Sequence, residues 1–254
     1  MPVGPAGGPL SRKDPMSPRT SAQGRSTRTD TATTSVEDYT KTIYGLTEWE
    51  DDPVVTASAL ARTLGVSNPS VTLMVRKMAE LGLVDHHPYA PLRLTEQGRR
   101  LALAMVRRHR LIETWLVREL GYDWGEVHDE AERLEHAVSE TFIDRLDERL
   151  ERPVVDPHGD PIPRRDLSME HPETERLCRV PESAAVRLEQ VDDAVPDALR
   201  TLAEEQVDIG ARITVRTAAA TEGGDVVVAR APAGEGIRLA HELAHAMRVS
   251  LVDR

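Results

Sequence analysis

The first regular pattern of apolar and polar residues predicts a helix near the start of the chain. Apolar residues recur at intervals of three and four from Val36 to Leu46, which places them on one face of a helix. Thr34 stands three residues before Glu37, a spacing that lets the two side chains cap a helix N-terminus reciprocally. We therefore expect this helix to begin at Thr34 and to end before Pro53.

Two further patterns predict a helix-turn-helix followed by a hairpin. Helices are expected over residues 57–64 and 67–81, with Gly65 in the turn between them. Short strands are expected over residues 83–87 and 92–95, and the proline-containing segment between them would form the tip of a wing. This arrangement is a winged helix-turn-helix.

The middle of the chain is predicted to be helical and the segment after it irregular. A long amphipathic helix is expected over residues 95–120, closed by Gly121. More helix is expected over residues 126–150, with a break near Ser139. Residues 152–180 carry several prolines and are interpreted as a linker.

The last quarter of the chain changes to short runs rich in β-branched residues, which are typical of strands. The predicted strands cover residues 185–191, 211–216, 225–229 and 248–252. Together with one or two helices, they would form a small β-barrel-like module.

The fold class that follows is mainly α, with an N-terminal winged helix-turn-helix, a helical domain and a small C-terminal β-barrel domain. The predicted parts are a disordered tail (1–33), a winged helix-turn-helix domain (34–95), a helical domain (96–151), a proline-rich linker (152–180) and the C-terminal domain (181–254). The tail is predicted to be disordered because it is rich in Pro, Gly, Ser, Thr and Arg and poor in apolar residues.

Composition indicates which residues form the core and in which cellular compartment the protein is expected. Aromatic residues make up only 3% of the chain, so the core must be aliphatic. A single cysteine, Cys178, excludes a framework of intramolecular disulfides and fits a reducing, cytoplasmic location. No apolar run approaches the roughly 20 residues of a membrane-spanning helix, so no membrane partner is expected.

The distribution of charge matters more than its sum. The net charge of −11 alone disfavours nucleic acid. However, six arginines fall between Arg93 and Arg110, whereas acidic residues gather between Asp123 and Glu151. A local basic face allows DNA binding, and the acidic region allows cation binding.

The second helix of the helix-turn-helix is the expected DNA-reading element. Its N-terminal end carries small residues, which would let the helix lie deep in the major groove. The candidate DNA-binding residues are Ser67, Asn68, Pro69, Ser70, Thr72, Leu73, Arg76 and Arg93. The arginines would contact phosphates and fix the register rather than read sequence. The alternative is a winged-helix module that binds protein.

A cluster of acidic and histidine residues predicts a metal site. Helical spacing places Glu132, Glu135 and His136 on one face, with His128 one turn earlier. Carboxylates at this spacing repel each other unless a cation neutralises them. The alternative is a solvated acidic helix face.

A second pair supports the metal interpretation. His109 and Glu113 lie four residues apart in the preceding helix. Two helices that each offer histidine and glutamate can build a site between them. Leu134 and Val138 place an apolar stripe beside the acidic residues, so the candidate ligands border the buried face.

Several motifs resemble the diphtheria toxin repressor family of iron- and manganese-dependent regulators, closest to its manganese transport regulator branch in three-domain form. They are Glu37-Asp38-Tyr39 before Thr42-Ile43-Tyr44, the Arg-Arg-His-Arg-Leu run at 107–111, the segment Val127–His136, and the segment 156–163. The resemblance covers a little over half of the chain. It implies a metal-activated homodimer that binds palindromic operator DNA and controls metal-uptake genes. The third domain more weakly resembles the SH3-like domain of the family.

The resemblance also implies two metal sites. The primary ligands would be Asp38, Glu132, Glu135 and His136. The ancillary ligands would be His109, Glu113 and His128. Asp38 and Glu132 stand where iron-sensing members place Met and Cys, and oxygen ligands with imidazole favour Mn²⁺, with Fe²⁺ as the alternative effector.

One position departs from the manganese branch. Two-domain manganese regulators have a glutamate ligand one turn after the aspartate, and Lys41 occupies that position here. The number of ions per subunit is therefore open. The third-domain ligands of the family have no clear match near residues 191–198, so whether this domain supplies a ligand is also open.

A match to H-E-x-x-H at residues 241–245 raises a different class, a zinc metallopeptidase. Three fixed positions match by chance often, and the motif lies nine residues from the end of the sequence. We therefore expect a regulator and not an enzyme.

Overall fold

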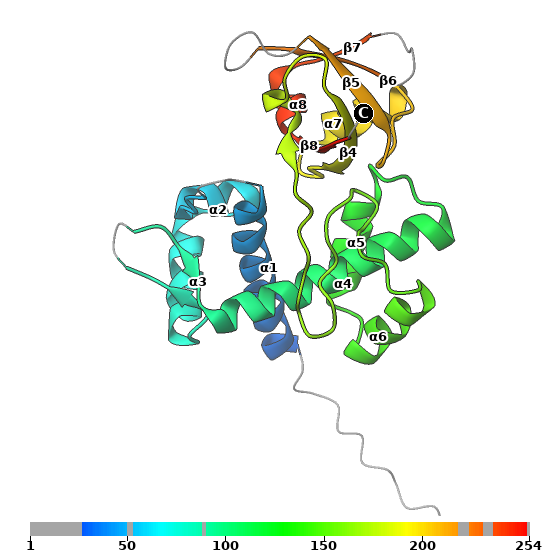
Figure 1. Cartoon of the computed structure of the whole chain (residues 1–254). Helices are drawn as coiled ribbons and strands as arrows, with labels where there is room; N and C mark the ends of the chain where they lie inside the picture. The colour runs from blue at the N-terminus through cyan, green and yellow to red at the C-terminus, as the bar shows by residue number, and fades with distance from the viewer. Residues whose placement is uncertain (1–26, 50–52, 88–89, 218–223, 231–235, 253–254) are drawn as a thin grey trace, which may run out of the picture.

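The computed structural model describes residues 27–49, 53–87, 90–217, 224–230 and 236–252. These residues form three packed units (Figure 1). Most of the predicted tail, residues 1–26, lies outside the described residues. Among the described helices, none combines the length and the apolar character needed to cross a membrane.

The first unit is a three-helix domain with a short hairpin. Its elements are α1 (Thr27–Glu48), α2 (Ala57–Thr63), α3 (Asn68–Glu80), β1 (Val84–Asp85) and β2 (Arg93–Leu94). The hydroxyl of Thr56 accepts from the backbone of α2, and the hydroxyl of Ser67 accepts from the Ser70 N–H at 3.3 Å, so both helices begin at capped residues. The aliphatic core between these helices includes Leu60 and Val71.

The start of α1 differs from the prediction. The helix begins at Thr27 rather than Thr34, so Thr34 lies inside the helix and does not cap it. Residues 27–33 contain neither glycine nor proline, so no helix-breaking residue separates them from the amphipathic stretch that follows. Part of the predicted tail is therefore helical.

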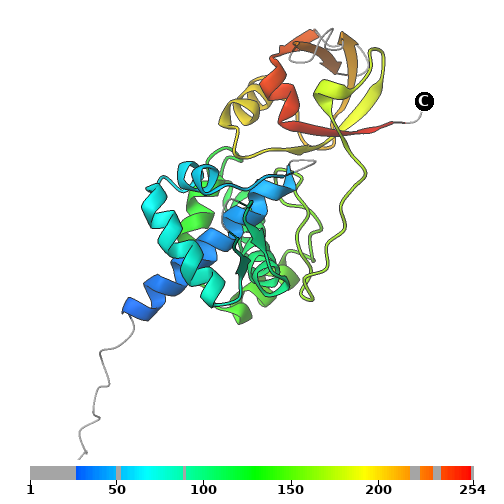
Figure 2. The same cartoon turned by 90° about the vertical axis from the view of Figure 1, so that its left-hand side faces the viewer.

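The second unit is helical and is built on α4 (Glu96–Leu120), which also packs against α1. Thr95 caps α4, and Gly121 ends it in the left-handed conformation with φ 72°. The shorter helices α5 (Val127–Glu135) and α6 (Glu140–Arg149) fold back beside it, with Ser139 capping α6 (Figure 1). In Figure 2 the third unit, coloured yellow to red, lies above the two helical units. The predicted break near Ser139 is therefore the start of a new helix.

The proline-rich segment is docked against α4 rather than free. Val155 and Pro161 form an isolated β-bridge, and the buried guanidinium of Arg110 donates to the Pro161 carbonyl at 2.7 Å. Arg107 donates to the Pro163 carbonyl in the same way. The two arginines thus donate charged hydrogen bonds to backbone carbonyls that face α4. These hydrogen bonds hold the segment in place.

The third unit begins earlier than predicted. The strand β3 (Glu175–Arg176) and the 3₁₀ helix η1 (Leu177–Arg179) lie inside the range predicted as linker, and β3 pairs with β8 (Met247–Leu251). Leu177 is fully buried in the core of this unit, which explains why the chain before residue 181 is ordered against it.

The third unit is an antiparallel sheet with two short helices. The strand order is β3-β8-β4-β5-β6-β7. The remaining elements are β4 (Ala185–Val191), α7 (Pro196–Glu204), β5 (Arg212–Thr217), β6 (Val226–Arg230), β7 (Gly236–Leu239) and α8 (His241–His245). All four predicted strands are present, whereas β7 was missed because its Gly-Ile-Arg-Leu sequence is short and barely alternates. The predicted fold class is confirmed.

Candidate metal centre

Three helices bring the predicted metal ligands together. The α1 helix carries Asp38, α4 carries His109 and Glu113, and α5 carries His128 and Glu132. Glu135 ends α5, and His136 is its C-cap residue. Because α4 packs against both α1 and α5, side chains far apart in the sequence meet at one place.

The primary cluster consists of Asp38, Glu132, Glu135 and His136. The Nε2 atom of His136 lies 2.7 Å from Asp38 Oδ1 and 3.5 Å from Glu135 Oε1. The other ring nitrogen, Nδ1, lies 3.0 Å from Glu37 Oε2. Glu37 therefore orients the imidazole so that Nε2 faces the carboxylates, a role that sequence spacing did not reveal.

Lys41 enters the same cluster from α1. Its ammonium lies 2.7 and 2.9 Å from the two oxygens of Glu135 and 2.5 Å from Glu132 Oε1. It also lies 3.4 Å from His109 Nδ1. The Glu135 carboxylate is completely buried, and burial of an unpaired charge is costly, so this ammonium neutralises it directly.

The ancillary cluster consists of His109, Glu113, His128 and Asp193. His109 Nε2 lies 2.9 Å from Glu113 Oε1 and 3.2 Å from His128 Nδ1. His128 Nδ1 in turn lies 3.0 Å from Asp193 Oδ2. The ligand atoms of these four residues all lie within 4.8 Å of one another.

Asp193 is the candidate ligand that the sequence analysis missed. It follows β4 in the third unit, inside the stretch where no third-domain ligand could be matched. The only sequence signal was the pair Asp192-Asp193 directly after a predicted strand. Nothing in the local pattern indicates that this turn reaches α5.

The ionisation of the cluster reflects its paired charges. Burial opposes protonation of His109, but Glu113 and Glu135 outweigh it and raise the pKa of His109 to about 9. Hydrogen bonds with Asp193 and Glu113 raise the pKa of His128 to about 10. Burial raises the pKa of Glu135, yet His109 and Lys41 lower it more, so the net shift is downward. In the absence of an ion, protons on the histidines balance the carboxylates.

Several buried carboxylate oxygens in the two clusters have the surroundings expected of ligands to a cation. In the described part of the chain, Asp38 Oδ1 and both Glu113 oxygens are buried without a hydrogen-bond partner. Asp38 Oδ1 and Glu113 Oε1 lie at ion-pair distances from imidazole nitrogens, but these contacts do not have hydrogen-bond geometry. Buried oxygens of this kind require compensation, and a divalent ion shared with the imidazoles would supply it.

A further buried group lies next to Glu113. Asp156 and His158 lie within ligand distance of Glu113, and the Nε2 atom of His158 meets the Trp124 carbonyl at 2.7 Å. Asp156 also lies 3.5 Å from the Arg110 guanidinium. This group braces the ancillary cluster from the docked proline-rich segment.

The predicted DNA-reading residues lie on the exposed face of α3 and on the hairpin. All eight are exposed, including Leu73, whose relative exposure is 66%. The opposite face of α3 is buried through Val71, Val75 and Met78. The helix is thus anchored on one side and open on the other.

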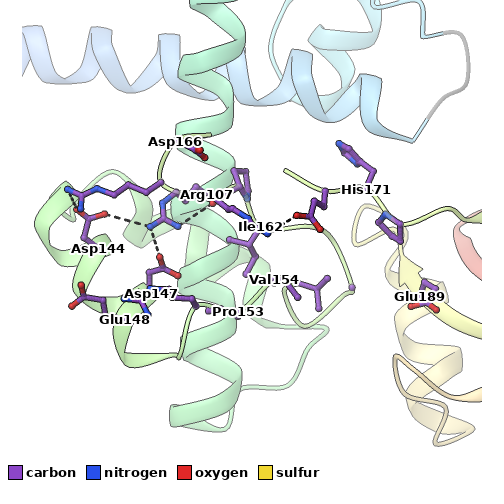
Figure 3. A pocket seen from close by; sticks show the side chains of 18 of the residues that line it. Arg107, Asp144, Asp147, Glu148, Pro153, Val154, Ile162, Asp166, His171 and Glu189 are labelled. Carbon is purple, nitrogen blue, oxygen red and sulfur yellow. Dashed lines mark hydrogen bonds and ion pairs between the residues drawn. The ribbon is translucent and has the colours of Figure 1, made fainter. Parts of the chain in front are cut away.

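A large hollow lies elsewhere in the structure. It measures about 910 Å³ and opens between α4, α6 and the proline-rich segment (Figure 3). Among the charged residues that line it, Arg107 lies 2.9 Å from Asp147 and 3.7 Å from Asp144. Its lining shares no residue with the primary or the ancillary cluster.

Comparisons with known proteins identify the family. Models of the iron-dependent repressor N-terminal DNA-binding domain and of the metal-binding and dimerisation domain match residues 31–92 and 95–164. The iron-dependent repressor IdeR of Mycobacterium leprae is 36% identical over 231 residues, or 86% of this chain and 97% of that protein. The diphtheria toxin repressor of Corynebacterium efficiens is 36% identical over 86% of this chain and 96% of its own length. The chain belongs to the diphtheria toxin repressor family.

Solved structures of metal regulators share the whole architecture. A manganese-dependent transcriptional repressor in complex with manganese has a TM-score of 0.80 and 42% identity, covering 85% of this chain and all of that one. The manganese regulator SloR has a TM-score of 0.72 and 32% identity, covering 85% and 98%. This member of the family is a metal-dependent, DNA-binding transcriptional repressor with a dimerisation domain.

The peptidase alternative is set aside. The family consists of transcriptional repressors and not enzymes, as predicted. In the structure, Glu242 of the H-E-x-x-H match is exposed and the motif is a helix of five residues.

Proposed function

We propose that this repressor responds to manganese: a metal-activated homodimer binds palindromic operator DNA and controls metal-uptake genes. The observation that carries the proposal is the ligand chemistry of the primary cluster, which offers carboxylate oxygens and imidazole but no sulfur. Hard oxygen donors with imidazole suit Mn²⁺, whereas thiolate and thioether ligands select softer ions. The similar solved structures include regulators titled as manganese-dependent.

Iron is the second candidate, and one observation favours it. The related repressors of Mycobacterium and Corynebacterium are named for iron or for the toxin gene, and Asp, Glu and His ligands also bind Fe²⁺. Affinity alone does not separate the two ions, so the test must compare them directly.

We assign one ion to each cluster. The primary ion would be held by Asp38, Glu135 and His136, with Glu132 adjoining. The ancillary ion would be held by His109 through Nε2 and by Glu113, His128 and Asp193. The Lys41 ammonium occupies the position that a further metal ion would take between Glu132, Glu135 and His109 Nδ1.

This assignment uses each His109 nitrogen once. A neutral imidazole binds a metal ion through one nitrogen and carries a proton on the other. His109 Nδ1 lies 2.7 Å from Glu135 Oε2, so its proton is donated to that carboxylate and Nε2 is left for the ancillary ion. The bridging histidine then couples the two clusters without sharing a metal.

The residues explain how a metal signal reaches DNA. Asp38 lies on α1 of the DNA-binding unit, whereas Glu135 and His136 belong to the helical unit. A divalent ion supplies the positive charge that lets these groups stay close. With Asp38 held against His136, α1 is fixed relative to α4, and so is α3, which packs in the same core as α1. The selected arrangement would place the two recognition helices of the dimer at operator spacing.

Within this mechanism α3 enters the major groove. Ser67, Asn68, Ser70 and Thr72 would meet base edges, and Pro69 and Leu73 would supply apolar contacts. Arg76 and the hairpin residue Arg93 would contact phosphates.

The test is operator binding with a duplex selected from a random pool in the presence of Mn²⁺. We expect tight binding with Mn²⁺ and none with chelator, measured by fluorescence anisotropy at fixed salt. Anaerobic Fe²⁺ and Zn²⁺ are compared at equal free concentrations. Binding that chelator leaves undiminished would refute the proposal, and activation by Fe²⁺ but not Mn²⁺ would replace manganese with iron.

The matched variants are Glu135→Ala and Asp129→Ala. Both remove a carboxylate from α5, but Asp129 is exposed outside the cluster. We expect Glu135→Ala to lose metal-dependent binding while circular dichroism shows a folded protein, and Asp129→Ala to bind as the wild type does.

A further inference from the structure

We propose a third cation site, for Zn²⁺, in the C-terminal unit, held by Cys178, His241 and His245. These residues belong to neither cluster of the metal centre. Cys178 lies on η1, and the two histidines begin and end α8. The site would hold a borderline-soft divalent ion in the unit that also contributes Asp193 to the ancillary cluster.

The backbone brings the three ligands together. His241 and His245 are four residues apart on a helix, so both rings project from one face, with centroids 5.6 Å apart. The η1 turn packs against this helix, and Cys178 Sγ lies 3.6 Å from His245 Nδ1. One ligand atom from each residue lies within 4.8 Å of the others.

These distances approach those of a tetrahedral zinc site. With Zn–S of about 2.3 Å and Zn–N of about 2.0–2.1 Å, neighbouring sulfur and nitrogen ligands stand roughly 3.5 Å apart. The Cys178–His245 separation of 3.6 Å already matches this edge. A small side-chain rotation of His241 would bring its ring nitrogen to the position of the third ligand.

His241 supplies an independent observation. In the described part of the chain, its Nδ1 atom is buried and has no hydrogen-bond partner. A buried ring nitrogen without a partner is destabilising, and coordination to an ion would compensate for it. The surroundings are firm, because Leu177 and Ala244 beside the ligands are fully buried.

The donor set selects the ion. A thiolate and two imidazoles are ligand types that bind the borderline-soft Zn²⁺ ion, and they differ from the carboxylate-rich clusters proposed for Mn²⁺. Three protein ligands leave the fourth position to water. The exposed Glu242 is not among the three ligands, and the ion would join the chain entering this unit to α8.

The test exploits the single cysteine of the sequence. The full chain is first loaded with Mn²⁺ and then titrated with Co²⁺, the spectroscopic substitute for Zn²⁺. A thiolate–cobalt charge-transfer band in the near ultraviolet can arise only from Cys178, because no other cysteine exists. We expect the band to saturate at one equivalent, with tetrahedral visible bands, and to disappear when Zn²⁺ is added.

Variants separate a built site from a reactive thiol. Cys178→Ser should abolish the band. His241→Gln should weaken Co²⁺ binding at least roughly tenfold, since even changes outside the ligand shell cost about 10–100-fold. His86→Gln, an exposed histidine on the hairpin, is the matched control and should leave binding unchanged.

Two results would overturn the proposal. One is the absence of a charge-transfer band in the wild-type chain. The other is a band that His241→Gln and His245→Gln both leave unchanged, which would indicate cobalt bound by the thiol alone. Because the readout is thiolate coordination and not operator binding, it is independent of the manganese proposal.

Discussion

The primary and ancillary clusters meet where His109 contacts Glu135, but they balance their charge in different ways. In the primary cluster the Lys41 ammonium lies against the buried Glu135 carboxylate. In the ancillary cluster no ammonium or guanidinium forms an ion pair with Glu113 in the described part of the chain, and the groups at ion-pair distance from its oxygens are imidazoles. The first cluster therefore keeps a permanent cation, whereas the second depends on protons or on a metal ion.

The clusters also join different parts of the molecule. The primary cluster connects α1 of the DNA-binding unit to α5, and the ancillary cluster connects α4 and α5 to Asp193 of the third unit. Loss of an ion from the first should release the DNA-binding helices. Loss from the second should release the third unit. The comparison therefore predicts that substitutions in the primary cluster and in the ancillary cluster have different consequences.

The largest effect is expected from Asp38→Ala. This change removes the only contribution of α1 to the proposed primary ligands, so the operator affinity at saturating Mn²⁺ should fall by about 100-fold or more. Anisotropy titrations measure the loss, with Asp129→Ala as the control. An Asp38→Ala protein that still binds operator in a Mn²⁺-dependent way would show that α1 is not coupled through this residue.

The next change, Lys41→Glu, alters the number of ions. It replaces the built-in ammonium with a carboxylate facing Glu132, Glu135 and His109, a group that requires a cation. We expect Mn²⁺ stoichiometry to rise from two to three per chain in equilibrium dialysis. Lys41→Gln, which removes the charge without adding a ligand, should show no such increase; an unchanged count for Lys41→Glu would exclude Lys41 as a cation substitute.

A smaller effect is expected from pH in the metal-free protein. The pKa of His109 is about 9 in the folded state, above its usual value of 6.5, because Glu113 and Glu135 outweigh the effect of burial. The resulting stability is therefore fully present below pH 6.5 and is lost as pH rises through 9. With chelator, the free energy of unfolding should fall by about 3 kcal/mol over this range.

Urea unfolding of the wild type and of His109→Gln measures this difference. Saturating Mn²⁺ should reverse the trend, since the ion binds deprotonated imidazole and its affinity rises with pH. A metal-free protein whose stability is the same at pH 6.5 and pH 9 would contradict the proton-balanced picture of the ancillary cluster.

The smallest effect is expected from Asp193→Asn. It weakens one ancillary ligand and leaves the primary cluster intact, so Mn²⁺ affinity should fall about tenfold at one site only. Isothermal titration should resolve this loss, while operator binding at saturating Mn²⁺ stays close to wild type. Asp197→Asn, an exposed residue in the same unit, is the control. Equal weakening of both sites would show that the clusters are not separable.

Helical spacing made much of the centre predictable from the sequence. Glu132, Glu135 and His136 share a face because α5 is a helix, and His109 and Glu113 share one on α4. The regular spacing of apolar residues predicted α4 itself. Its start at Thr95 and its end at Gly121 were predictable because cap residues carry a local signal.

The remainder depends on contacts between distant segments, which have no local pattern. Asp193 reaches His128 across 65 positions, and Lys41 reaches Glu135 across 94. The resemblance to the family indicated that Lys41 stands where two-domain manganese regulators have a glutamate, but not that its ammonium would lie beside the Glu135 carboxylate. The approach of Cys178 to α8 was equally invisible, because it depends on how η1 packs in the third unit.

The most direct test of the account is anomalous diffraction at the manganese edge from crystals of the full chain grown with Mn²⁺. We predict two peaks per chain, one bounded by Asp38, Glu135 and His136 and one bounded by His109 Nε2, Glu113, His128 and Asp193. A peak between His109 Nδ1, Glu132 and Glu135, with the Lys41 ammonium displaced, would contradict the assignment, as would the absence of a peak beside Asp38.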